Sequence, residues 1–320
     1  MIRLNVPCAV ATLLAVVPCV TVAQEARLVR MATGSPAGVY FPVGLSLCRL
    51  VNENRSEHKI RCAAETSEGS LDNLEKLRAK DVDLAIVQSD VQAAASTGDN
   101  AFDTMRAVMS LYPETVTIVA GSDTDIDSLA ALEGKRISAG PMGSAQRAMW
   151  NTLMAAEGWT EESFADLLDL SPADQASSLC EGQIDAFVTT IGHPALTVQE
   201  ATLGCDAEIV PVESPEIEQF VSESSALVQA EIPGGLYAGH AEPIPSFGVT
   251  ATVITRTNVS EEIVYTFVSA ALINLDRLRL FDPALADLEI ETMASAGLSV
   301  PLHDGAAQAF DAAANPVPAN

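Results

Sequence analysis

The stretch that decides the fold is Ala32-Thr33-Gly34-Ser35-Pro36-Ala37-Gly38-Val39-Tyr40-Phe41-Pro42-Val43-Gly44. It follows a short apolar segment that predicts a β-strand, and it leads into apolar residues at helical spacing, Val43, Leu47, Leu50 and Val51. A glycine-rich turn between a strand and a helix presents backbone N–H groups and the positive end of the helix dipole. The turn lacks the signature of a nucleotide-binding P-loop and the spacing of a dinucleotide fingerprint. It therefore predicts a site for a small anion, and a carboxylate fits better than a nucleotide.

A second turn of this kind stands in the other half of the chain. Gly140-Pro141-Met142-Gly143-Ser144 follows a strand predicted for 135–139 and opens a helix that ends at Gly158. Strands and helices alternate around both turns, with further strands predicted at 84–87, 116–120 and 247–255 and a long helix at 261–280. This order predicts an α/β fold with parallel sheets wrapped by helices. We expect two lobes, residues 24–115 with 246–320 and residues 116–245, whose turns face one ligand cleft.

The first 23 residues have the pattern of a secretory signal. Arg3 precedes a short apolar run, and Thr21-Val22-Ala23 is a small-x-small cleavage site, so the mature chain is expected to begin at Gln24. A membrane anchor is the alternative, but the run is short and contains two prolines. A lipid anchor at Cys19 lacks the small preceding residues that such a site prefers. The pattern predicts an exported protein.

The charge of the chain excludes several partners. It carries 43 acidic and 17 basic residues, a formal net charge of −26 at pH 7. Such a field repels nucleic acid and anionic lipid, and it also repels an anionic solute at long range. An anion site must therefore act through local donors inside a cleft.

Four cysteines remain after the signal is removed, Cys48, Cys62, Cys180 and Cys205. An even number in an exported chain favours disulfides. Three connectivities are possible, and four free buried thiols are the alternative. We expect the sequential pairs, Cys48 with Cys62 and Cys180 with Cys205. The spacings contain no CxxC, which argues against redox or zinc chemistry.

Short motifs follow one another from about residue 28 to 310. They are Thr33-Gly34, Gly38, Tyr40-Phe41-Pro42 and Gly44; Thr66, Gly69-Ser70 and Asn73-Leu74; Asp83-Leu84-Ala85-Ile86-Val87-Gln88-Ser89-Asp90; Leu111-Tyr112-Pro113-Glu114; Gly134-Lys135-Arg136; Gly140-Pro141, Gly143-Ser144 and Arg147; Gly192-His193-Pro194; Ile232-Pro233-Gly234-Gly235 and Tyr237; and Pro301-Leu302-His303 with Gly305-Ala306. In this order the chain resembles the TAXI-type solute-binding receptors of tripartite ATP-independent periplasmic (TRAP) transporters. Phe41 and Ala145 depart from the family pattern, which has tyrosine and often glycine there.

The resemblance implies a two-lobe, type II periplasmic binding protein fold. It also implies a periplasmic receptor that captures a small solute, an acidic amino acid or a dicarboxylate. The receptor would deliver that solute to a multi-span membrane transporter subunit driven by an ion gradient. We expect the receptor to be a monomer that needs no cofactor.

The candidate ligand residues lie in the two turns and at the ends of strands, where ligands of open α/β sheets bind. Arg147 could grip a carboxylate with its planar fork, or it could pair with one of the many acids. Ser144 could also cap its helix, Ser89 or Asp90 could cap another, and His193 could be structural. The expected contacts are Thr33, Gly34, Gly38, Tyr40, Thr66, Ser67, Gln88, Ser89, Asp90, Gly140, Gly143, Ser144, Arg147, Gly192 and His193.

Catalysis finds little support in the sequence. It has no GxSxG and no HExxH, and its four histidines are scattered at 58, 193, 240 and 303. We therefore expect neither an enzyme nor a metal site. A periplasmic sensor that signals to a membrane kinase remains the alternative to a transport receptor. The identity of the solute does not follow from the sequence.

Overall fold

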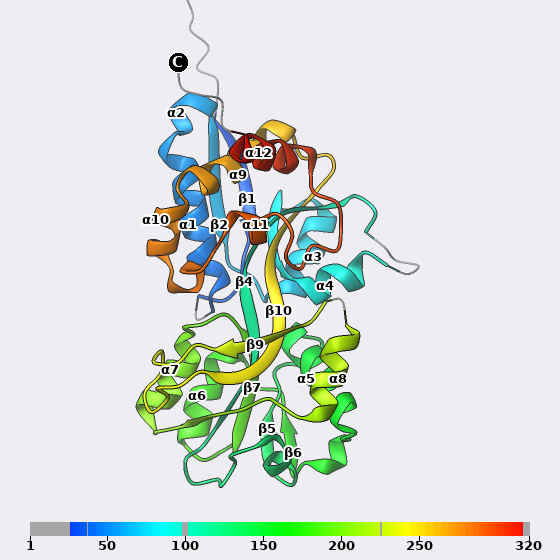
Figure 1. Ribbon diagram of the computed structural model, residues 1–320, viewed down its shortest axis with the longest axis vertical. Coiled ribbons are helices and arrows are strands. Elements are labelled where there is room, and N and C mark those ends of the chain that lie inside the picture. Colours follow the sequence, from blue (N-terminus) through cyan, green and yellow to red (C-terminus); the bar gives the residue numbers. More distant parts are fainter. Residues whose placement is uncertain (1–25, 37, 98–101, 225, 316–320) are drawn as a thin grey trace, which may run out of the picture.

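The computed structural model describes residues 26–36, 38–97, 102–224 and 226–315. The expected signal peptide and its cleavage site lie outside these ranges. Figure 1 shows an elongated molecule with two lobes, and the chain ends in the same lobe in which it starts. Within the described ranges, no helix has both the length and the apolar character that a bilayer crossing requires.

The first lobe is built on three parallel strands. β1 (Arg27–Ala32) lies between β2 (Ile60–Glu65) and β3 (Leu84–Gln88). The helices that follow these strands are α1 (Tyr40–Glu53), α2 (Arg55–His58), α3 (Ser70–Ala79) and α4 (Ser89–Ala95). Because parallel strands end at the same edge of a sheet, the starts of α1, α3 and α4 gather at that edge.

Two long antiparallel strands join the lobes. β4 (Met105–Ala120) and β10 (Ile244–Arg256) run side by side from one lobe into the other (Figure 1). The sheet order is β2-β1-β3-β10-β4-β7-β5-β6, with β8 on β4 and β9 on β10. The strand predicted for 116–120 is thus only the second half of β4. Pro113 lies within β4, opposite Thr250 and beside a register shift between Thr250 and Thr252, where a proline is accommodated.

The second lobe repeats the α/β pattern. Its strands are β5 (Arg136–Ser138), β6 (Asp166–Leu168), β7 (Ala186–Ile191), β8 (Glu208–Val210) and β9 (Val228–Ile232). Its α-helices are α5 (Ala145–Glu157), α6 (Pro172–Cys180), α7 (Leu196–Gly204) and α8 (Pro215–Glu223), with 3₁₀ turns η1 (Leu129–Leu132) and η2 (Glu161–Ser163). The short segment before β5, η1, is thus a 3₁₀ turn and no α-helix.

The C-terminal segment returns to the first lobe (Figure 1). It contains α9 (Glu261–Ile273), α10 (Leu275–Phe281), η3 (Pro283–Leu285), α11 (Ile290–Met293) and α12 (Asp304–Ala314). The single helix expected for 261–280 is wrong, because the chain leaves helical geometry at Asn274. The Asn274 side chain donates to the Ala270 carbonyl, a local bond with which asparagine competes against helix continuation. Ser260 precedes α9 but makes no capping bond.

The apolar cores lie on either side of the crossing. Leu47, Phe267 and Tyr112 belong to the first-lobe core, whereas Val116 and Phe247 pack with Trp150 in the second. Each of the long strands β4 and β10 therefore contributes residues to both cores. The lobe boundaries at 115/116 and 245/246 stay a proposal, and Phe247 packs in the second-lobe core although it lies just beyond the second of them.

Both expected disulfides are present, Cys48–Cys62 between α1 and β2, and Cys180–Cys205 between the ends of α6 and α7. Replacing Cys180 and Cys205 together by serine is expected to lower the free energy of unfolding by about 3 kcal/mol, since that bridge closes a 25-residue loop. Urea unfolding of the variant and the parent measures the difference. Free thiols in a non-reducing peptide map of the parent would contradict the pairing.

Candidate functional site

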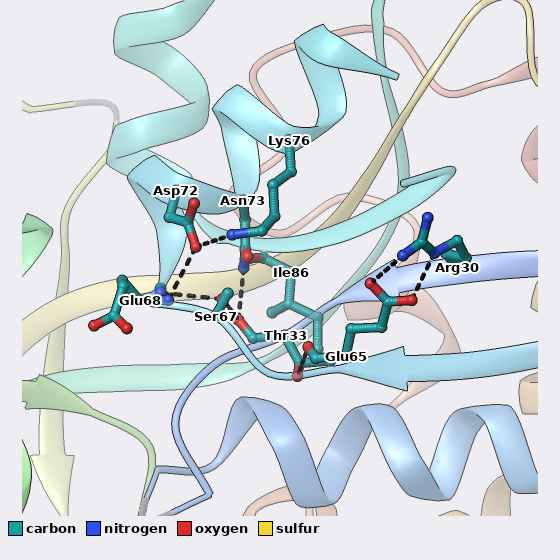
Figure 2. A network of polar contacts seen from close by, with 10 residues as sticks. Arg30, Thr33, Glu65, Ser67, Glu68, Asp72, Asn73, Lys76 and Ile86 are labelled. Carbon is teal, nitrogen blue, oxygen red and sulfur yellow. Dashed lines mark hydrogen bonds and ion pairs between the residues drawn. The ribbon is translucent and has the colours of Figure 1, made fainter. Parts of the chain in front are cut away.

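The first glycine-rich turn is shorter than the sequence predicts, because α1 already begins at Tyr40. Gly44 lies inside the helix, where a Cβ would stand 2.4 Å from the Thr33 side chain. Thr33 itself holds the turn to its neighbours (Figure 2): its hydroxyl donates to the Glu65 carbonyl, and its own carbonyl accepts from Ser67 and Asn73. The side chains of Thr33 and Ser67 therefore fix the backbone of the turn.

All three helix N-termini at this edge lack a side-chain cap. Val39 precedes α1, Gly69 precedes α3 and Gln88 precedes α4, and none makes a capping bond. Asp72 stands in the first turn of α3, where it pairs with Lys76, whereas the first turn of α1 contains no acidic residue. The backbone N–H groups at the start of α1 are thus the better place for an anion.

A buried polar cluster, the Glu114 cluster, lies where β4 leaves the first lobe. It consists of Tyr40, Ser70, Gln88 and Glu114. The Tyr40 hydroxyl donates to the Glu114 carboxyl at 3.1 Å and lies 3.3 Å from the Ser70 hydroxyl, which accepts from the Gln88 backbone. Burial raises the pKa of Glu114 to about 8, and hydrogen bonds from Gln88 and Tyr40 oppose that rise in part.

Sequence reasoning placed Glu114 in a motif but not among the site residues. The available signal was an acid within an otherwise uncharged run, Val108 to Ala120, which the strand predicted for 116–120 did not reach.

Ser89 and Asp90, two predicted contacts, are already bonded to protein. The Ser89 hydroxyl donates to the Ala226 carbonyl and accepts from the Thr250 backbone, so it ties α4 to β10. Asp90 accepts from the backbone of Val91, and burial raises the pKa of its carboxyl. Neither residue caps α4, since the preceding residue is Gln88.

Arg147 forms an ion pair with an acidic residue of the protein, which is one of the two roles considered for it in the sequence analysis. Its guanidinium, 5% exposed, donates to the Gly140 carbonyl at 3.2 Å and pairs with Asp169. Ser144 caps α5 by accepting from the Arg147 backbone. Gly140 and Gly143 both adopt positive φ, 81° and 78°, which favours glycine at both positions. Arg147 therefore braces the second turn, and its direct contact with a solute stays a prediction.

His193 is held by hydrogen bonds on both ring nitrogens. Nε2 lies 2.7 Å from the Thr115 hydroxyl and 3.0 Å from that of Thr117, and Nδ1 lies 2.5 Å from the Tyr237 hydroxyl. That hydroxyl also accepts from the Ala195 backbone, so it fixes the ring against the start of the segment that follows His193. Burial lowers the pKa of His193 to about 4. These bonds are consistent with the structural alternative of the sequence analysis, and direct contact of His193 with a solute stays a prediction.

Several contacts bring the two lobes together at the predicted site. A Cβ on Gly192 would stand 2.5 Å from the Tyr112 ring, so glycine permits that close approach. The Gln88 amide donates to the Thr190 carbonyl at 3.5 Å, and Ala145 packs against the first-lobe cluster that contains Val87. Thr66 is exposed on the loop between β2 and α3. Both glycine-rich turns therefore belong to the region between the lobes.

A pocket of about 190 Å³ opens between the lobes. Its lining comes from the first turn and α1, from the segment after His193, and from the start of η3: Pro36, Gly38, Val39, Pro42, Pro194, Leu196, Gln199 and Asp282. This volume is below the roughly 300–1,000 Å³ of pockets for drug-sized ligands, so it suits a small solute. A larger hollow of about 680 Å³ around Arg49 is wide open and lies on the first lobe alone. The described residues include no group of three or more metal-ligating side chains.

Comparison with known proteins identifies the family of this chain and solved structures with a similar fold. The model of the NMT1-like family matches residues 31–312. The chain belongs to the NMT1-like family. Its fold is that of the two-lobe periplasmic binding proteins, as two solved structures illustrate. MatC from Rhodopseudomonas palustris with bound malate has 14% identity and a TM-score of 0.54, over 81% of this chain and 88% of that one. The alkanesulfonate-binding protein SsuA from Xanthomonas axonopodis pv. citri, bound to MOPS, has 19% identity and a TM-score of 0.52, over 92% and 93%.

Proposed function

We propose that this NMT1-like protein is a periplasmic solute receptor of the TAXI type. It captures a small carboxylate between its lobes and delivers it to the multi-span membrane subunit of a TRAP transporter. The observation that carries the proposal is the uncapped start of α1, which has no acid in its first turn and borders the pocket between the lobes. The family, the fold and the order of the motifs support the same function.

The anion is held by local donors. In a chain with a net charge of −26, long-range attraction cannot draw in a carboxylate. Fixed N–H groups at the start of α1 accept no proton and need no reorganisation, and they act more strongly when the closing lobes exclude water. The lobes move as units on β4 and β10, which is the hinge geometry of domain closure.

A thermal-shift screen tests this function. It includes carboxylates, sulfonates and uncharged amides of matched size, because the similar structures contain malate in one case and MOPS in the other. A carboxylate at 100 times its dissociation constant is expected to stabilise the fold by about 2.7 kcal/mol. A screen in which the best solute is uncharged, cationic or a sulfonate would contradict the carboxylate assignment.

A charge-only variant tests where the anion lies. Thr66 is exposed near the ends of β1 and β2, so Thr66→Glu adds a negative charge beside the proposed site without disturbing the core. We expect it to weaken carboxylate binding by about 1 kcal/mol at low salt, whereas the neutral control Thr66→Gln leaves binding within a factor of two. Calorimetric titrations of both variants provide the measurement. Equal affinities would place the anion elsewhere.

A further inference from the structure

Three carboxyl groups between the lobes lack a basic partner. Glu114 is 3% exposed and Asp282, in the lining of the pocket, is 8% exposed, whereas Asp90 is partly buried at the start of the neighbouring α4. Within the described part of the chain, every ion pair involves other acids. Buried acids normally have a counter-charge, so this arrangement points to one that arrives with a ligand.

Among the described residues, the groups that face Glu114 include no basic side chain. They are Tyr40 from α1, Gln88 from β3 and Asp90 from α4. Tyr112 lies on β4 itself. Burial chiefly raises the pKa of its hydroxyl, and the carboxyl of Asp282 at the start of η3 adds to that rise. The partner strand β10 places Val249 opposite Glu114. None of these groups is a lysine or an arginine.

The same region holds hydrogen-bonding atoms without partners. Gln88 is 5% exposed, and its Oε1 has no donor although its amide group bonds to Glu114 and Thr190. The hydroxyls of Thr190 and Tyr112 are buried without a partner as well. An unsatisfied buried acceptor destabilises the protein, and an ammonium group brings three donors. A carboxylate oxygen of Glu114 and Gln88 Oε1 are two acceptors for such a group.

We propose that Glu114 recognises an ammonium group on the solute and releases its own proton to solvent when that solute binds. The receptor then selects α-amino acids over carboxylates that lack the amino group. The inference rests on the proposed function, because the carboxylate of the same solute occupies the start of α1. One tyrosine side chain separates the two positions, since Tyr40 begins α1 and its hydroxyl contacts Glu114.

Proton release follows from the protonation of the Glu114 carboxyl before the solute binds. With a pKa of about 8, the Glu114 carboxyl is mostly protonated at pH 7, and an ammonium group stabilises its ionised form. Binding therefore expels close to one proton at pH 7. The affinity for an amino acid rises by about tenfold per pH unit between pH 5 and 7, whereas a plain carboxylate gains nothing from this group.

Calorimetry of the mature protein with matched pairs tests the inference. The probes are L-glutamate with glutarate, L-aspartate with succinate, and L-alanine with propionate, each in phosphate and in Tris at pH 7. We expect the amino acid of at least one pair to bind at least tenfold tighter and to release nearly one proton. Glu114→Gln removes both effects. The control Glu75→Gln, an acid 72% exposed on α3, keeps both.

The outcomes separate the two proposals. Equal or tighter binding of the deaminated acids overturns the role of Glu114 and leaves the carboxylate receptor intact, and so does binding without proton release. A preference that survives Glu114→Gln also overturns it. If no member of any pair binds, both proposals fail. If Glu114→Gln does not fold, the proton count and the pH dependence of the parent protein decide alone.

Discussion

Replacing Gly248 by alanine is expected to cost about 3 kcal/mol or more of folding stability. Gly248 lies on β10 at the crossing, paired with Thr115 of β4 and Val228 of β9. A Cβ there would stand 1.9 Å from the Glu114 carbonyl oxygen and 2.9 Å from the Thr115 Cα. Both atoms are backbone, so no rotamer change relieves the clash and the two strands must separate. Chemical unfolding of the variant measures the loss.

Gly204→Ala is the matched control for this variant. Gly204 ends α7, its φ is not in the left-handed region, and the nearest atom to an added Cβ is the Cys180 sulfur at 3.8 Å. That is ordinary contact, and we expect a change within about 0.5 kcal/mol. If Gly248→Ala proves as stable as Gly204→Ala, the close approach of β4 and β10 at the crossing is wrong.

The second large effect is the pH dependence that Glu114 imposes on stability. Its pKa is about 8 in the folded protein against 4.5 for an ordinary glutamate, so the folded state binds the extra proton between these values. Stability from this group is full below pH 4.5 and is lost as pH rises through 8. His193 acts in the opposite direction between its folded pKa of about 4 and the ordinary histidine pKa of 6.5. Above pH 6.5 only the Glu114 contribution of the two remains.

We therefore expect the parent protein to lose about 2 kcal/mol of unfolding free energy between pH 6.5 and 8 through Glu114. Glu114→Gln, which keeps the shape of the protonated acid, is expected to lack this loss. Urea unfolding of both proteins at intervals of half a pH unit provides the comparison. Parallel curves for the two would show that Glu114 is ionised in the folded protein.

The features that sequence could predict are local ones. The two turns, the cap at Ser144 and the alternation of strands and helices depend on residues close in the chain, and the structure contains all of them. The disulfides followed from the cysteine count and the short separations. The site residues of the first lobe lie at one edge because parallel strands end there.

What sequence could not predict depends on distant partners. The strand predicted for 116–120 is part of β4, which starts at Met105 and continues through Pro113 beside a register irregularity in its pairing with β10. The partner of Arg147 is 22 residues away, and Asp169 is one of many acids in the chain. The role of Glu114 depends on Tyr40, which is 74 residues earlier. Burial is set by these long-range contacts, so no local pattern reveals the perturbed pKa of the carboxyl.

The central claim is that one solute is held between the lobes at the start of α1. Hydrogen–deuterium exchange of the full mature protein, with and without the solute found in the screen, tests it most directly. The account predicts slower exchange in 33–44 of the first lobe and, at the same time, in 190–197 of the second. Protection confined to one lobe, or to the open hollow around Arg49, would contradict the account.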